Sequence, residues 1–173
     1  MSKVFEKYKD SREDAILVEG MEKYCIDLEV DPTDVVMLVM AYKMNATKMC
    51  EFKRDSFVSF WSKAKCEDIS SMKAYIPKLR ESLANGPEFE KIYKFAFDFG
   101  RESNQKTLPL DIALAFWDLL IKDKYSAYPV WCEFLQKNYG KSISKDTWVL
   151  FLEFINTVPT DLSSYDSDGT CNT

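Results

Sequence analysis

Apolar side chains recur at helical spacing along most of the chain. Between residues 16 and 28 the apolar residues compatible with one helical stripe are Ile16, Val18, Met21, Tyr24, Cys25 and Leu28. Asp31, Pro32 and Asp34 then combine a capping carboxylate, a proline suited to the first helical position and a second acid that favours the helix dipole. They predict a helix that begins at Pro32. Residues 35–42 are apolar on every side, so this helix should be central.

The second half of the chain shows the same periodicity. Gly86 and Pro87 open a stretch whose apolar stripe is Phe89, Ile92, Tyr93, Ala96 and Phe97. Alternation at residues 93, 95, 97 and 99 would also suit a strand, but the proline start and the longer stripe favour a helix. Further helices are predicted after Pro109, around Trp131, and from a Ser144 cap through Val158.

These patterns predict an all-α fold. The chain has only five glycines and few hairpin signals, so little sheet is expected. Residues 85–87, Asn-Gly-Pro, interrupt the helices near the middle of the 173 residues. We therefore expect two helical halves that share one interface.

The composition removes most catalytic and metal-binding classes. The chain has no histidine, which excludes His-assisted nucleophiles and most zinc sites. Its five cysteines lack zinc-knuckle spacing, and no phosphate-binding loop or nucleophile elbow is present. We expect no catalytic residue, no cofactor and no metal.

The charge and the apolar runs bear on partners and location. The net charge is −5 and the 23 basic residues are scattered, whereas a nucleic-acid binder usually shows a basic stripe. The longest apolar run, residues 35–42, is about half of what a bilayer requires. Residues 1–10 are charged and lack the apolar core of a signal peptide. We therefore expect an intracellular protein that binds neither nucleic acid nor membrane.

Three local features have both an ordinary and a functional interpretation. Met37, Met40 and Met44 share one helical face, which suits core packing or an adaptable apolar pocket. Asp146 follows the Ser144 cap, where it could complement the helix dipole or await a basic side chain of a partner. Residues 166–169, Asp-Ser-Asp-Gly, open like a calcium loop but lack its later ligands. From the pattern alone, the ordinary interpretation is favoured for each.

An ordered set of short segments resembles the potentiating-neddylation domain of the defective-in-cullin-neddylation family over residues 5 to 169. The segments include Tyr8-Lys9-Asp10, Asp31-Pro32, Cys50-Glu51-Phe52, Ile76-Pro77-Lys78, Phe116-Trp117 and Ser144-Lys145-Asp146-Thr147-Trp148. The resemblance implies two EF-hand-like helical halves packed into one domain without functional calcium loops. That domain would span residues 1–169, with halves of about 1–84 and 87–169, and residues 170–173 would form a short divergent tail.

The resemblance also implies a function. Members of the family are non-catalytic scaffolds, or co-ligases, that promote cullin neddylation and are found in the nucleus and cytoplasm. They bind the N-acetylated methionine of the neddylation conjugating enzyme and a cullin C-terminal domain, and they reach the cullin's RING partner only indirectly. The acetyl-methionine pocket of the family falls here on Val18, Met21, Met37, Met40, Ala41, Met44, Cys50, Phe52, Phe99, Phe116 and Leu119. The family's cullin-facing aspartate falls on Asp146.

The C-terminal end departs from the family pattern. Thr170 stands where relatives have alanine, and residues 171–173 replace a further acidic, apolar segment. Two of the three residues of the family's cullin patch are thereby altered or absent. The alternatives are a regulatory relative that binds the conjugating enzyme but engages cullin poorly, an EF-hand-like calcium sensor, and a thioester-forming ligase. The missing calcium ligands and the absence of histidine weigh against the last two.

Overall fold

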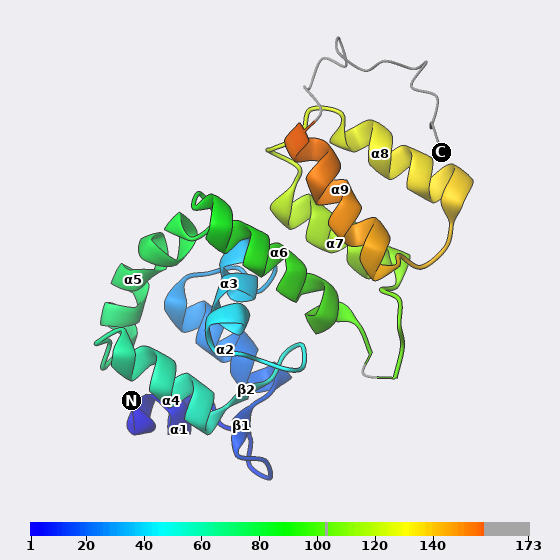
Figure 1. Cartoon of the computed structure of the whole chain (residues 1–173). Helices are drawn as coiled ribbons and strands as arrows, with labels where there is room; N and C mark the ends of the chain where they lie inside the picture. The colour runs from blue at the N-terminus through cyan, green and yellow to red at the C-terminus, as the bar shows by residue number, and fades with distance from the viewer. Residues whose placement is uncertain (103, 158–173) are drawn as a thin grey trace. The chain divides into compact units, whose positions relative to one another are not determined.

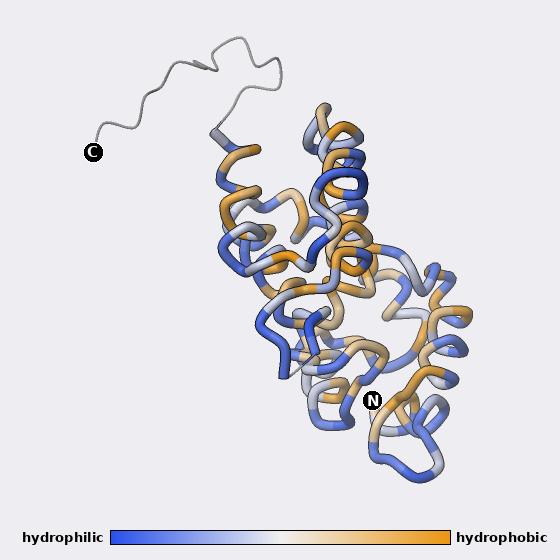
Figure 2. Tube along the Cα trace, turned by 90° about the vertical axis from the view of Figure 1, so that its right-hand side faces the viewer, coloured by the Kyte–Doolittle hydropathy of each residue, from blue (hydrophilic) through white to orange (hydrophobic). Residues whose placement is uncertain are grey.

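The computed structural model describes residues 1–102 and 104–157, and these are mostly helical, which confirms the all-α prediction (Figure 1). The helices are α1 (Ser2–Tyr8), α2 (Val18–Leu28), α3 (Val35–Lys43), α4 (Arg54–Lys63), α5 (Ile69–Glu81), α6 (Gly86–Gly100), α7 (Leu110–Leu120), α8 (Tyr128–Phe134) and α9 (Lys145–Thr157). A π-helical turn, Leu135–Tyr139, follows α8 directly. Along the tube of Figure 2 the helices alternate between hydrophobic and hydrophilic segments, as expected of amphipathic helices.

The chain divides into two compact units, Met1–Gly100 and Arg101 onward. The predicted break at residues 85–87 is a helix boundary, since α5 ends at Glu81 and α6 begins at Gly86. The first unit nevertheless includes all of α6, because α6 packs on α3. The Tyr42 and Phe95 rings lie 5.6 Å apart, and Lys43 forms an ion pair with Glu88.

Aromatic side chains from three helices form the core of the first unit. Phe5 of α1 lies 5.6 Å from Phe57 of α4, and Tyr24 of α2 lies 5.5 Å from the same ring. Tyr8 meets Tyr24 edge-on at 5.2 Å. Such edge contacts add about 0.5 to 1.5 kcal/mol each to ordinary apolar burial. They hold α1 and α4 against α2.

The start of α3 differs from the prediction. The helix begins at Val35 and its cap is Asp34, whose Oδ1 accepts a hydrogen bond from the Val36 N–H at 2.8 Å. Asp31 instead closes a tight turn, accepting from the Thr33 N–H at 2.7 Å. The predicted start at Pro32 is therefore wrong by three residues. Asp31 and Asp34 are both suitable helix caps, and Asp34 is the one that also binds the Arg80 guanidinium.

Replacing Asp34 with alanine is expected to lower the free energy of unfolding by about 1 to 2 kcal/mol, the usual worth of a helix cap. Arg80 of α5 also donates to both carboxylate oxygens of Asp34, at 2.9 and 2.6 Å. Burial opposes ionisation of Asp34, but Arg80 and the Val36 N–H outweigh it and hold the pKa of Asp34 below its usual value. Its contribution is present above the unfolded pKa and is lost as the pH falls through the folded one.

Urea unfolding of the two proteins at pH 7 and near pH 3 measures both effects. The difference between wild type and Asp34→Ala should shrink at the lower pH. Asp31→Ala is the matched control and should cost clearly less, since Asp31 caps only a turn. An equal loss for both variants would show that Asp34 is not the cap that matters.

The second unit is built around a stack of aromatic rings. Trp117 of α7 stacks on Trp148 of α9 at 4.9 Å, and Trp131 of α8 stacks on Phe151 of α9 at 4.6 Å. These contacts bring α7, α8 and α9 side by side (Figure 1). The Ser144 cap is confirmed, because its Oγ accepts from the Thr147 N–H at 3.1 Å. Helix α9 then runs through Thr157.

Each unit contains an antiparallel backbone pairing between two loops that precede helices. In the first, strand β1 (Ala15–Ile16) pairs with β2 (Phe52–Lys53), with Ile16 opposite Phe52. In the second, Leu108 pairs with Ile143 just before α7 and α9 begin. The EF-hand-like description of the halves stays a prediction, as does a domain spanning residues 1–169. The calcium-loop-like residues 166–169 and the divergent tail 170–173 lie outside the described residues.

Candidate functional site

All residues predicted for the acetyl-methionine pocket except Phe116 and Leu119 lie in the first unit. Helix α2, helix α3 and strand β2 bring most of these together. Phe52 pairs with Ile16, two residues before Val18 begins α2. Farther along α2, the Cys25 Sγ donates to the Met37 Sδ of α3 at 3.6 Å. The structure thus places the predicted residues of α2, α3 and β2 on adjoining elements.

Burial separates this set into two groups. Met40 is fully buried, and Met44 and Met21 are 2% and 7% exposed, so these three are part of the core of the unit. Val18 is 54% exposed, Cys50 is exposed, and Met37 and Phe99 are half-buried. Only the members of the second group are open to direct contact with a ligand. The three buried methionines have flexible side chains that can adapt to a neighbouring ligand.

Two cysteines of the first unit differ in burial. The Cys25 thiol is buried, and its burial, with Asp31 and Cys50 nearby, raises its pKa to about 11. It therefore stays a thiol near neutral pH and is a poor nucleophile. Cys50 is a free, exposed cysteine with a left-handed backbone, φ 56°. That conformation is uncommon for a residue with a side chain and fixes the turn between α3 and β2.

The other two predicted pocket residues lie on α7 in the second unit. Phe116 and Leu119 are three positions apart, which places them on one face of that helix. Phe116 is 6% exposed and Leu119 is 36% exposed. Within its own unit Phe116 is therefore part of the core, whereas Leu119 is partly open to solvent.

Asp146 lies in the first turn of α9 and is exposed. Within residues 1–102 and 104–157 its carboxylate forms no ion pair. The Ser144 Oγ already caps the helix through Thr147, so the Asp146 carboxylate is not required as the cap. It remains available to a basic side chain of a partner.

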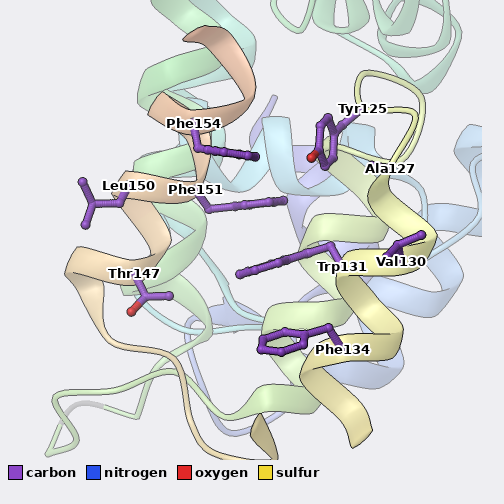
Figure 3. Close-up of a pocket in the computed structure, with 9 residues that line it drawn as sticks. All are labelled: Tyr125, Ala127, Val130, Trp131, Phe134, Thr147, Leu150, Phe151 and Phe154. Atoms are coloured by element: carbon purple, nitrogen blue, oxygen red, sulfur yellow. The ribbon is translucent and has the colours of Figure 1, made fainter. Parts of the chain in front are cut away.

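A second apolar site, which the sequence analysis missed, is a groove between α8 and α9 with a volume of about 610 Å³. We call it the α8–α9 groove, and its lining residues are Tyr125, Ala127, Val130, Trp131, Phe134, Thr147, Leu150, Phe151 and Phe154. Figure 3 shows Trp131 and Phe134 of α8 and Phe151 and Phe154 of α9 projecting into the space between the helices. None of the residues predicted for the acetyl-methionine pocket lines it.

The described residues offer no obvious metal site. No group of three or more cysteine, aspartate or glutamate side chains in that part of the chain is arranged to hold a metal ion. Nor does it contain a helix of the length and apolarity needed to cross a membrane.

Comparison with known proteins gives the family. Residues 71–171 match the cullin-binding family, and the chain therefore belongs to it, that is, to the defective-in-cullin-neddylation proteins. The chain is 40% identical over 173 residues to DCN1-like protein 3 of Xenopus laevis, and 38% identical to that of Homo sapiens. It is 38% identical over 151 residues to DCN1-like protein 4 of Drosophila melanogaster.

These alignments cover most of this chain but only part of each relative. The alignments include 97% of this chain for the two DCN1-like protein 3 sequences and 87% for the Drosophila protein. They include only 57% and 61% of the relatives' own lengths. The chain thus spans less than two thirds of each of these relatives.

Proposed function

We propose that this chain is a non-catalytic scaffold that promotes cullin neddylation. It would bind a cullin C-terminal domain and the N-acetylated methionine of the neddylation conjugating enzyme, and reach the RING partner indirectly. The observation that carries this proposal is the match to the cullin-binding family over residues 71–171, which includes all of α9 and its exposed Asp146. The resemblance of the sequence also implies a nuclear and cytoplasmic location, which we adopt as part of the proposal.

The proposed mechanism is proximity. Holding the loaded conjugating enzyme beside the cullin makes the transfer effectively unimolecular, and well-oriented reactants gain greatly from this. In this proposal the chain supplies no nucleophile or general base. The chain has no histidine to activate a cysteine, and burial raises the pKa of the Cys25, Cys66 and Cys132 thiols. Its contribution would be two binding surfaces, an apolar one for methionine and an acidic one for cullin.

A reconstituted neddylation reaction tests this proposal. Adding the chain to the conjugating enzyme, a cullin C-terminal domain and its RING partner should raise the initial rate of cullin modification. Calorimetric titrations with the cullin domain and with an acetylated N-terminal peptide of the conjugating enzyme should each show saturable binding. An unchanged rate, with no binding to either partner, would refute the scaffold function.

A regulatory relative is the second candidate, because Thr170 stands in place of the family's alanine in the cullin patch. Such a protein would bind the acetylated peptide but hold cullin poorly. In the same reconstituted reaction it would lower the rate by sequestering the conjugating enzyme. The sign of the rate change distinguishes the two candidates.

Asp146→Arg is expected to weaken cullin binding by about 1 kcal/mol, roughly fivefold in Kd. The carboxylate lies at an exposed helix start, where an ion pair is partly screened, and the arginine would repel a basic partner. Binding of the wild type should also weaken as salt increases. Asp55→Arg is the matched control, because Asp55 is likewise exposed in the first turn of a helix, α4. Indifference to Asp146→Arg and to salt would assign the cullin contact to another surface.

A further inference from the structure

We infer that the α8–α9 groove binds an amphipathic segment of the cullin, with aliphatic side chains on the aromatic floor and Lys or Arg side chains along the α9 edge. This inference rests on the proposed cullin-binding function and extends it beyond the single contact at Asp146. It makes α8 and the outer side of α9 a second, apolar part of the cullin interface.

The first observation is apolar exposure concentrated in one place. Val130 is 68% exposed, Leu150 is 60% exposed and Phe134 is 50% exposed. All three line the same groove, from two different helices. Exposed apolar side chains that are scattered singly need no explanation, but a contiguous patch around a hollow is typical of a protein-binding surface. The groove therefore needs an apolar occupant.

The second observation is that the floor is preorganised. Trp131 and Phe151 stack at 4.6 Å with an interplanar angle of 11°, and Phe134 stacks on Trp131 at 6.2 Å. Phe151 also contacts the buried Trp117 edge-on at 5.1 Å. Trp131 and Phe151 both contact Trp117 and are thus held by the core beneath them, so ordering these two rings for binding costs little side-chain entropy. In Figure 3 the rings of Phe154, Phe151, Trp131 and Phe134 follow one another along the space between the helices, with Leu150 on the α9 side and Val130 on the α8 side.

The third observation is the charge of the α9 edge. Asp146, Leu150 and Glu153 are spaced i, i+4 and i+7, so they lie along one side of the helix. Both carboxylates are exposed, and neither forms an ion pair among the described residues. On α8, Glu133 is already paired with Lys137 at 2.5 Å. The α9 edge therefore favours a segment that carries Lys or Arg beside its apolar side chains.

Two features favour a cullin segment over the chain's own residues 158–173 or a second copy of the chain: the groove adjoins the proposed cullin contact, and its α9 edge is acidic. Thr147, which lines the groove, directly follows the proposed cullin contact Asp146, and the family match covers every groove-lining residue. Residues 158–173 of the chain carry three aspartates and no Lys or Arg, so they would bring like charge to this edge. A second copy, with a net charge of −5, is disfavoured for the same reason.

The test is a titration of a cullin C-terminal domain against a groove variant, Val130→Asp with Leu150→Asp. Because both side chains are exposed, the fold should survive, and binding should weaken about tenfold or more through loss of apolar burial and desolvation of the new charges. Glu153→Lys should weaken binding less, and more strongly at low salt. Ile26→Asp is the matched control, since Ile26 is 73% exposed on α2 and should leave cullin affinity unchanged.

Methyl NMR of the wild type identifies the occupant. The Val130 and Leu150 methyl signals should shift on addition of the cullin domain, and the Ile26 signal should not. If these signals instead shift with protein concentration, or on removal of residues 158–173 without cullin, the occupant is a second copy or the chain's own end. Either result overturns the inference.

The same titrations separate this inference from the proposed function. If the wild type binds cullin and Asp146→Arg weakens that binding while the groove variant binds normally, the inference fails and the proposed function stands. If the wild type does not bind cullin at all, the cullin-binding part of the proposed function fails, and the inference fails with it.

Discussion

Gly20→Ala is expected to destabilise the first unit by more than about 3 kcal/mol, the range of severe overpacking. A Cβ atom at Gly20 would lie 1.9 Å from the carbonyl oxygen of Tyr8 and 3.2 Å from the Ile16 Cγ2. The closest obstacle is backbone, which cannot rotate aside as a side chain can. The Tyr8 carbonyl belongs to α1, so α1 and α2 could not keep their close approach.

Urea denaturation monitored by circular dichroism measures this effect, and Gly86→Ala is the matched control. Gly86 also lies in a helix, at the start of α6, but no atom from beyond its chain neighbours and its own helix backbone lies within 4 Å of where its Cβ would be. That variant should be neutral or stabilised by up to about 1 kcal/mol, because alanine favours helix more than glycine does. Equal stability of the Gly20 and Gly86 variants would contradict the packing described here.

The helical character of the chain could be predicted from its sequence because local signals and long-range packing agree. Residues 86–100 show how an ambiguity was resolved. Alternation favoured a strand, but the three- and four-residue stripe and the proline start favoured the helix that α6 forms. The start of α3 was misplaced because Asp31 and Asp34 are both good caps. Only the tertiary partner Arg80, 46 residues away, shows which one caps the helix.

Helices α5 and α1 are two that were not predicted, for different reasons. Helix α5 was not among the predicted helices, yet Met72, Ile76 and Leu79 follow helical spacing and Asp68 with Ser71 forms a capping box. Helix α1 is too short and too charged for its pattern to stand out. Its burial of Phe5 and Tyr8 depends on α2 and α4, which are distant in sequence.

The candidate sites also could be predicted only where local sequence determines them, and not where packing between distant elements does. Exposure of Asp146 followed from its place beside a helix cap, which is local information. The different exposures of Val18 and Met40 could not follow from periodicity, because they depend on what packs against each element. The α8–α9 groove was missed for a related reason. A signal was nevertheless present in the sequence. Residues 148–152 are all apolar, and five consecutive apolar residues surround a helix instead of forming one buried face, so some of them had to lie on the surface of α9.

N-terminal acetylation is expected to raise the affinity of the conjugating-enzyme peptide by about a hundredfold or more. A free methionine terminus carries an ammonium group, whose desolvation in an apolar pocket costs several kcal/mol. Acetylation removes that charge and leaves the methionine side chain, whose burial contributes about 1.5 to 3 kcal/mol. Calorimetry with the two peptides, which differ only in the acetyl group, measures the difference. Equal affinities would contradict an apolar pocket for the acetylated terminus.

Val18→Asp tests whether the acetylated peptide binds to the first unit. Met40→Asp is a poor probe, because Met40 is fully buried and an aspartate there would cost stability before it affected binding. Val18 is 54% exposed, so its replacement should leave the fold intact while placing a hydrated carboxylate where the peptide would bury apolar surface. We expect binding of the acetylated peptide to fall at least tenfold. Ile26→Asp, on the same helix, should bind as wild type does. Equal losses for both variants would show that the effect is one of net charge, and the peptide would then have to bind away from the start of α2.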